Sequence, residues 1–271
     1  RDQPRSRGLG DVYKRQALDD EANRDKYAAF AEGYKVYFDP STRFMRGLDS
    51  EGNWRTPFNP RASNHRNDDY CEGTAWQWTW FVPHDVDGLV ELMGGRDAFI
   101  GKLDSLFTAD SKLEGESTSV DISGLIGQYA HGNEPSHHIA HLYNYVGQPW
   151  RTQEIVDEVL HTLYFNNPDG LSGNEDCGQM SAWYILNAMG FYQVCPGKPV
   201  YSIGRPLFNE ATVHLKDGKS FKVIAHNNSR DNKYVRSIVL NGNKLETPFF
   251  THQDIVDGGT LELTMGSEPL K

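Results

Sequence analysis

Two adjacent carboxylates, Glu175 and Asp176, occupy a glycine-flanked turn in the stretch GLSGNEDCGQMSAWYILNAMGF, residues 170–191. A helical pattern follows the turn from about residue 177 to 189, and Gly190 is its stop. An Asp at a helix start accepts amide protons and is stabilised by the positive end of the helix dipole. The same dipole keeps the carboxylate ionised, as a general base requires. Asp176 is therefore a candidate base as well as a candidate helix cap.

A second turn, HGNEPSHH at residues 131–138, places Glu134 in front of another helical pattern. His137 and His141 are four residues apart, and on one helix face that spacing can hold a metal such as zinc. The stretch lacks the glutamate of a zinc-protease helix. The plainer interpretation is an acidic residue at a helix start, followed by partly buried histidines.

The third cluster, DDYCEGTAWQWTWFVPHD at residues 68–85, contains Glu72 between Tyr70 and Trp76. A carboxyl group held against aromatic surface has a raised pKa, because desolvation disfavours its charged form. Such a group can act as a general acid at neutral pH. The alternative is a surface glutamate in a turn.

Composition excludes several other classes of protein. The formal net charge is −10, whereas a protein that binds nucleic-acid phosphates needs a basic face. No apolar run approaches the ~18 residues of a membrane span. The three cysteines, Cys71, Cys177 and Cys195, form no CxxC pair, which argues against a cysteine zinc site but allows one disulfide. The sequence contains neither a GxSxG elbow nor a phosphate-binding glycine loop.

The elements that must position these residues are mostly helical. Helical patterns are interrupted by glycine and proline, and they predict a mainly α layer or toroid over residues 17–199. Residues 200–271 instead alternate apolar and polar residues around the turns KDGK and NGN, which predicts hairpins. We expect this part to be a small C-terminal β-sheet cap packed on the helices, because a few strands alone bury little. The helical patterns lie at about 18–32, in EGTAWQWTWFV, DGLVELMGG, GRDAFIGKLDSLFTAD, SGLIGQYAHG, EPSHHIAHLYNYVG and PWRTQEIVDEVLHTLYF, and at 177–189.

The first sixteen residues, RDQPRSRGLGDVYKRQ, are basic and aperiodic, unlike the acidic remainder. They resemble a translated sequencing-adapter segment at the end of a metagenomic read, and we expect them to lie outside the fold. The natural protein would then begin upstream, and this chain would be its C-terminal fragment.

Taken together, the motifs resemble the α-mannosidases of glycoside hydrolase family 92. The resemblance is carried by YCEGTAWQWTWFVPHD, DISGLIGQYAHGNEPSHHIAHLYNYVGQPWRTQ and PDGLSGNEDCGQMSAWYILNAMGFYQVCPG, with FDPSTRFMRG and GGTLELTMG in support. It implies an (α/α)₆-barrel catalytic domain, only part of which this chain would supply. It also implies an N-terminal β-sandwich, absent here, and calcium-aided, inverting, exo-acting hydrolysis of α-mannosides.

The resemblance assigns roles to individual residues. Glu72 matches the general acid and Asp176 the general base, and inversion needs such a pair ~6.5–9.5 Å apart with room for one water. Some members have a second acidic residue two positions before the base; here that position is Asn174, so Asp176 would act alone. Asn133 and Glu134 match part of the calcium and mannose subsite. The residues implied to contact the substrate are Arg46, Trp76, His84, Asp85, Glu116, Glu134 and Asn174.

The implied substrate is terminal α-linked mannose, in α-1,2-type mannosides or on N-glycans, and the implied partners are mannose-containing glycans. The parent would be a secreted, periplasmic or cell-surface bacterial protein. Two alternatives stay open. The chain could be an inactive carbohydrate-binding remnant of a truncated mannosidase, or a zinc hydrolase that uses His137 and His141.

Overall fold

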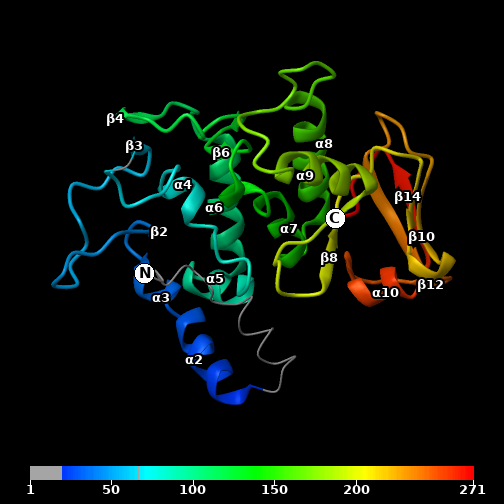
Figure 1. The fold of residues 1–271 in the computed structure, drawn as a ribbon. Helices are drawn as coiled ribbons and strands as arrows, with labels where there is room; N and C mark the ends of the chain where they lie inside the picture. Colours follow the sequence, from blue (N-terminus) through cyan, green and yellow to red (C-terminus); the bar gives the residue numbers. More distant parts are fainter. Residues whose placement is uncertain (1–19, 66) are drawn as a thin grey trace. The chain divides into compact units, whose positions relative to one another are not determined.

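The computed structural model describes residues 20–65 and 67–271 (Figure 1). The chain divides into two compact units. Unit 1 contains the chain up to Ile122 together with residues 126–129 and 195–198. Unit 2 contains residues 123–125, 130–194 and 199–271. The segment 1–16, expected to be foreign, lies outside the described residues.

Unit 1 consists of helices and short strands. Asp85 begins one helix by accepting the amide proton of Gly88 at 3.0 Å, as an N-cap residue does. Another helix buries Phe99, Leu103 and Leu106 along one face. The elements are α2 (Glu21–Ala31), α3 (Tyr34–Tyr37), β1 (Phe38–Asp39), β2 (Phe44–Met45), β3 (Ala62–Asn64), α4 (Ala75–Trp78), α5 (Val86–Leu92), α6 (Arg96–Thr108) and β4 (Glu114–Ser117). The chain passes between the units within β5 (Leu125–Ile126) and β6 (Tyr129–Ala130).

Unit 2 begins with helices. Pro149 opens the longest of them at a position where its missing amide proton costs nothing. This helix buries Ile155, Val156, Val159 and Leu160 on one face. The helical elements are the 3₁₀ turns η1 (Glu134–Ser136) and η2 (Ile139–His141), then α7 (Leu142–Tyr145), α8 (Pro149–Thr162) and α9 (Gln179–Met189).

The C-terminal part of unit 2 is β-rich, and its hairpins agree with the sequence prediction. A five-stranded sheet has the order β12-β11-β14-β10-β9, and a three-stranded sheet has the order β13-β8-β7. The predicted KDGK and NGN turns join the antiparallel pairs β9–β10 and β11–β12. The elements are β7 (Phe191–Tyr192), β8 (Val200–Ile203), β9 (Glu210–His214), η3 (Lys216–Gly218), β10 (Ser220–His226), β11 (Tyr234–Leu240), β12 (Asn243–Lys244), β13 (Phe249–Thr251), α10 (His252–Val256) and β14 (Gly259–Gly266).

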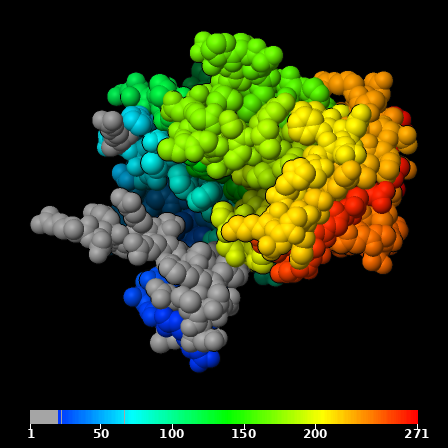
Figure 2. Space-filling view, turned by 45° about the vertical axis from the view of Figure 1, so that its right-hand side comes forward, coloured from blue at the N-terminus to red at the C-terminus, as the bar shows by residue number. Residues whose placement is uncertain are grey.

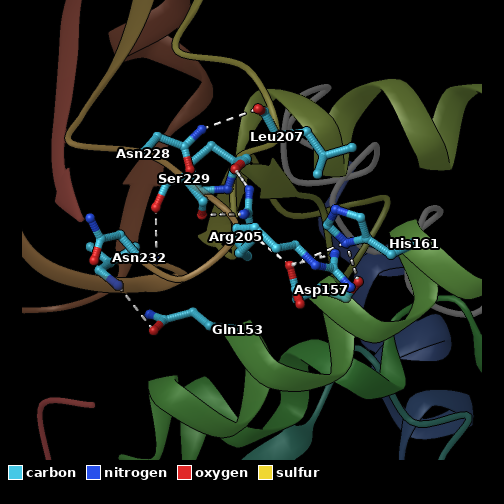
Figure 3. A network of polar contacts seen from close by, with 11 residues as sticks. Gln153, Asp157, His161, Arg205, Leu207, Asn228, Ser229 and Asn232 are labelled. Atoms are coloured by element: carbon cyan, nitrogen blue, oxygen red, sulfur yellow. Dashed lines mark hydrogen bonds and ion pairs between the residues drawn. The ribbon is translucent and has the colours of Figure 1, made fainter. Parts of the chain in front are cut away.

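Helix α8 is fastened to the β-rich part by buried polar contacts (Figure 3). Arg205, which follows β8, pairs through Nε with the carboxylate of Asp157 on α8 at 2.8 Å. The same guanidinium donates to the carbonyl oxygen of Ser229 at 3.0 Å. One turn earlier on α8, the side-chain oxygen of Gln153 accepts the amide proton of Val235 at 3.1 Å. Helices and sheet of unit 2 are thus joined by directed bonds as well as by apolar packing.

The expected mainly α architecture is wrong. The structure is 32% helical and 22% strand, with several sheets, so it is a mixed α and β protein. The residues 123–132, expected to form a short helix, form β5 and β6, and Gly124 and Gly127 between and beside them have positive φ of 60° and 59°. The 134–147 helix is likewise broken into η1, η2 and α7. In both places glycine or proline interrupts an apolar pattern that has no single helical face.

Candidate active site

The turn before α9 contains two neighbouring carboxylates, Glu175 and the candidate base Asp176. Helix α9 begins at Gln179, so Asp176 lies outside it. The carboxylate of Glu175 accepts protons from the Ser181 amide at 3.1 Å and from the Ser181 hydroxyl at 2.9 Å. Glu175 therefore satisfies the exposed amide in the first turn, a role that the sequence pattern had offered to Asp176. Asp176 is exposed in the same turn.

The backbone at the two candidate catalytic residues is left-handed. Asp176 and Cys177 have φ of 51° and 57°, and Gly178 continues the turn with φ of 96°. Glu72 has φ of 50°. A non-glycine residue in this region costs on the order of 1 kcal/mol or more, and such residues gather at functional sites. Both turns therefore hold a non-glycine residue in a conformation that costs free energy.

A row of buried polar groups lies beside Asp176. The Nε2 atom of His137 donates to the carbonyl oxygen of His131 at 2.9 Å, so its Nδ1 atom accepts from the Gln179 amide at 3.0 Å. Burial lowers the pKa of His137 to about 4, although the His131 contact and the nearby Asp176 carboxylate act in the opposite direction. His137 is thus neutral at pH 7, and it lies within electrostatic range of Asp176.

Glu134 lies near the other end of this row. The Gln179 amide also donates to the Tyr192 hydroxyl at 3.3 Å. Burial raises the pKa of Tyr192 to about 12; the Gln179 contact opposes this shift, and the negative charge of Glu134 adds to it. Two exposed carboxylates, Glu134 and Asp176, therefore flank neutral donors and acceptors. Such an arrangement suits a ligand that carries several hydroxyl groups.

The residues expected to bind calcium supply the oxygen atoms that the ion prefers, but fewer of them than it usually takes. Glu134 offers an exposed carboxylate, and the buried Asn133 side-chain oxygen accepts the Glu134 amide proton at 3.1 Å. Both are hard oxygen ligands of the type that calcium prefers. Calcium takes about 6–8 oxygens. Within residues 20–65 and 67–271 no group of three or more His, Cys, Asp or Glu side chains could hold a metal.

The geometry gives no support to a zinc pair. The 134–145 segment is not one helix, so His137 and His141 do not share a helix face. His141 is fully buried, and its ring contacts the Asn187 amide oxygen at 2.8 Å and the Ser202 hydroxyl at 3.1 Å. The ring nitrogens of both histidines are therefore engaged by protein groups. The spacing argument fails because it assumed a regular helix.

In unit 1, Glu72 lines a pocket of about 430 Å³ together with His65, Asp68, Asp69, Tyr70 and Cys71. The next residue, Gly73, lies so close to Trp78 that an added Cβ would come within 2.8 Å of the indole ring. That indole donates to the Cys71 carbonyl at 2.8 Å. The turn that carries Glu72 is thus fixed on the Trp78 ring.

The aromatic rings near Glu72 in the sequence pack mostly on other partners. Trp76 contacts Phe44 with ring centroids 4.9 Å apart, and the Lys102 ammonium lies 4.7 Å from its ring centroid. Trp80 is fully buried against Phe99. Glu72 itself is exposed in this structure. The structure therefore does not hold this carboxyl group against aromatic surface as the sequence suggested, and its role as general acid stays a prediction.

The remaining predicted substrate contacts occupy different environments. Arg46 is buried and pairs with Asp39 at 2.6 Å. His84 contacts the Ala31 carbonyl at 3.0 Å, and Asp85 accepts from the Tyr34 hydroxyl at 2.7 Å. Glu116 is exposed on β4 in unit 1. Asn174 is exposed in the turn that carries Asp176. The predicted site residues that belong to unit 2 are Asn133, Glu134, Asn174 and Asp176. Those that belong to unit 1 are Arg46, Glu72, Trp76, His84, Asp85 and Glu116.

Comparison with known proteins decides the family. Residues 14–267 match the glycosyl hydrolase family 92 catalytic domain. This chain belongs to glycosyl hydrolase family 92. The resemblance drawn from the motifs is therefore confirmed over nearly the whole chain.

Solved family 92 structures share this fold. A family 92 α-mannosidase from Bacteroides thetaiotaomicron, in complex with mannoimidazole, is 41% identical, has a TM-score of 0.89, and matches 96% of this chain and 34% of its own. A family 92 inverting mannosidase from the same organism is 39% identical, with a TM-score of 0.84, and matches 97% of this chain and 36% of its own. A protein from Arthroderma benhamiae named as an uncharacterized secreted glycosidase is 32% identical over 200 residues, 73% of this chain and 24% of its own. The chain thus spans about a quarter to a third of these relatives.

Three residues of this chain that lie near the candidate base received no role in the sequence analysis. Glu175 was visible in the turn, but its capping bond needed the position of Ser181, six residues on. Gln179 and Tyr192 become notable only when folding brings them to His137. An uncharged glutamine in the first turn of α9, where acidic residues are favoured, is the one local signal.

Proposed function

We propose that this chain forms part of the catalytic region of an exo-acting α-mannosidase that releases terminal α-linked mannose with inversion. One observation carries the proposal: the exposed Asp176 lies in a left-handed turn just before α9, within electrostatic range of the buried, neutral His137. Beside it, the Gln179 side-chain carbonyl and the Tyr192 hydroxyl are uncharged groups of a kind that bonds to sugar hydroxyls. Family membership and the α-mannosidase relatives support the reaction type.

The proposed step is a single displacement. The oxygen of a water molecule forms a bond to the anomeric carbon while the bond to the leaving oxygen breaks. Asp176 accepts a proton from the attacking water, and Glu72 donates a proton to the departing oxygen. Because His137 is neutral, it does not pair with Asp176 as a cation and does not weaken it as a base.

We propose further that Asn133 and Glu134 are ligands of a calcium ion. When bound, it would hold sugar hydroxyls and polarise them; water and the sugar itself would complete its shell. Isothermal titration of calcium into the protein tests this without reference to turnover. Calcium binding that is lost in Glu134→Gln is expected, and equal binding by both proteins would contradict the assignment.

The proposed substrates are α-1,2-linked mannosides and the mannose of N-glycans. The name of the Arthroderma benhamiae relative supports export of the natural protein from the cell. Within the described residues no helix is long and apolar enough to cross a membrane. Assays of culture supernatant and cell fractions on a panel of mannobioses test both points together.

The substitution Asp176→Asn tests the proposed base. We expect turnover of α-1,2-mannobiose by the complete gene product to fall about 10²–10⁴-fold, the usual contribution of a positioned base. Asp231→Asn is the matched control, since Asp231 is an exposed carboxylate of unit 2 that lies outside the loop preceding α9. Equal turnover by Asp176→Asn and the control would show that Asp176 is not the base. If the unaltered protein binds mannobiose without hydrolysing it, a carbohydrate-binding remnant is favoured instead.

A further inference from the structure

A second concave site lies between α9 and the loop that precedes it. The pocket has a volume of about 550 Å³, within the range of about 300–1,000 Å³ that is usual for ligand sites. Ser181, Tyr184 and Ile185 line it from one face of α9, at the i, i+3 and i+4 positions. Phe165, Asn166 and Asn167 line it from the loop. The chain between α8 and α9, lime green in Figure 2, lies at the visible surface.

The lining of this pocket carries no formal charge. None of its ten residues is Asp, Glu, Lys, Arg or His, although charged residues make up 24% of the chain. A charged ligand would lose hydration on entering and would find no counter-charge among these ten residues. The composition of the pocket therefore selects a neutral ligand.

The lining combines exposed apolar surface with amide groups. Phe165 is 60% exposed and Ile185 is 48% exposed, so the pocket presents two large apolar side chains to solvent. Beside them, the exposed Asn166 and Asn167 each carry two amide donors and a carbonyl acceptor. A sugar ring presents a C–H face and a rim of hydroxyls, so it can use both kinds of surface at once.

The loop is already shaped for binding. Backbone bonds run from the Phe165 amide to the Gly170 carbonyl at 3.0 Å and from the Gly170 amide to the Asn167 carbonyl at 3.1 Å. A Cβ on Gly170 would lie 1.9 Å from the Phe165 carbonyl oxygen, so only glycine permits this closure. A closed loop loses little conformational entropy when a ligand arrives.

The pocket adjoins the candidate base through shared residues. Ser181, which lines the pocket, is the partner of Glu175, and Glu175 precedes Asp176 in the chain. A glycan held in the pocket could therefore extend along the start of α9 toward Asp176. This continuity makes a second sugar unit of the same glycan the natural occupant.

We propose that the pocket of Phe165, Asn166, Asn167, Tyr184 and Ile185 binds a neutral hexopyranose unit of the substrate glycan, other than the mannose that is cleaved. The inference rests on the proposed function for the identity of that glycan. It assigns a recognition role to a loop outside the acid and base. Ring faces would come from Phe165 and Tyr184, and hydroxyl contacts from the two asparagines.

Titration of the ¹⁵N-labelled chain with α-1,2-mannobiose tests the proposal. We expect the side-chain amide signals of Asn166 and Asn167 to shift in the unaltered chain and equally in Asp176→Asn. Phe165→Ala should weaken this binding about tenfold, in line with the contribution of one aromatic contact. Phe208→Ala is the control, because Phe208 is 41% exposed in the same unit and does not line the pocket.

The outcomes separate this inference from the proposed function. If mannobiose shifts signals around Asp176 and leaves Asn166 and Asn167 unchanged, or shifts nothing, the pocket is not a sugar subsite. Equal binding by Phe165→Ala and Phe208→Ala would also overturn it. Shifts at both asparagines, combined with full turnover by Asp176→Asn, would retain the subsite and reject the proposed base.

Discussion

At the scale of single residues, sequence motifs locate candidate site residues but do not fix the role of each one. The motifs located Asp176 in an exposed turn, but they could not separate its role from that of Glu175, because the Ser181 contacts exist only after the turn has folded. Arg46 shows the opposite difficulty. Its motif implied a sugar contact, yet its guanidinium is buried on Asp39 and lies 4.4 Å from the Phe58 ring centroid. A charged residue in a motif can serve the scaffold that carries the site.

The substitution Asp39→Asn should destabilise the protein at this buried pair. Burial alone would raise the pKa of Asp39, but hydrogen bonds from Ser41, Arg46 and Thr42 lower it to about 2. Loss of the charge leaves Arg46 buried without its counter-ion, which costs about 3 kcal/mol. Denaturant unfolding measures the loss. Glu246→Gln, which breaks an exposed pair with Lys244, is the control and should change stability by less than about 1 kcal/mol; an equal effect of both variants would refute this account.

At the scale of elements, prediction was best where a pattern had one clear face. Helix α8 and the β9–β10 hairpin were both readable, because an apolar stripe or a strict alternation repeats along them. The segment 134–147 was misread as one helix. Its side chains are buried on nearly all sides, and His137 and His141 bond to α9 and β8 rather than along a helix. Long-range bonds of this kind leave no periodic trace in the sequence.

The cap of α9 gives a prediction at this scale. Glu175→Ala removes both bonds to Ser181 and should cost about 1 kcal/mol of stability, as loss of a helix cap usually does. Turnover should fall as well, because the left-handed turn that carries Asp176 loses its anchor. Glu175→Gln keeps one carbonyl acceptor and should recover most of both properties. Thermal melts and turnover of the two variants compare them, and wild-type behaviour of Glu175→Ala would show that the cap is dispensable.

At the scale of the whole molecule, the family was readable and the architecture was not. The match over residues 14–267 follows from long motifs that a single sequence displays. The balance of 32% helix and 22% strand was missed, since short strands such as β5 and β6 lack the length for a clear alternation. The grouping of residues 195–198 with unit 1 depends on contacts such as that of Lys198 with the His84 carbonyl at 3.0 Å. Contacts between distant residues cannot be read from local pattern.

Stability should fall as the pH falls from about 6.5 toward about 4. Burial lowers the pKa of His137 and of His141 to about 4, although bonds to His131 and Asn187 oppose the shift. Burial also lowers the pKa of His131 well below its ordinary value. An unfolded histidine takes up a proton near pH 6.5, so acid favours the unfolded chain by several kcal/mol in sum. The melting temperature at pH 7.5 should therefore exceed that at pH 5.0.

Two variants make this pH test specific. His141→Gln should reduce the dependence, because glutamine can bond to Asn187 and Ser202 without titrating in this range. His226→Gln should leave it unchanged, because His226 is exposed beside Glu262. A melting temperature that is constant between pH 7.5 and 5.0 would contradict the account of the buried histidines.

The central claim is inverting hydrolysis of α-mannosides by direct attack of water. Proton NMR of the complete gene product acting on α-1,2-mannobiose tests it most directly, because the anomeric signal of the released mannose appears before mutarotation. Direct attack of water on the anomeric carbon predicts β-mannose as the first product. Initial release of α-mannose, or no release of mannose, would contradict the claim.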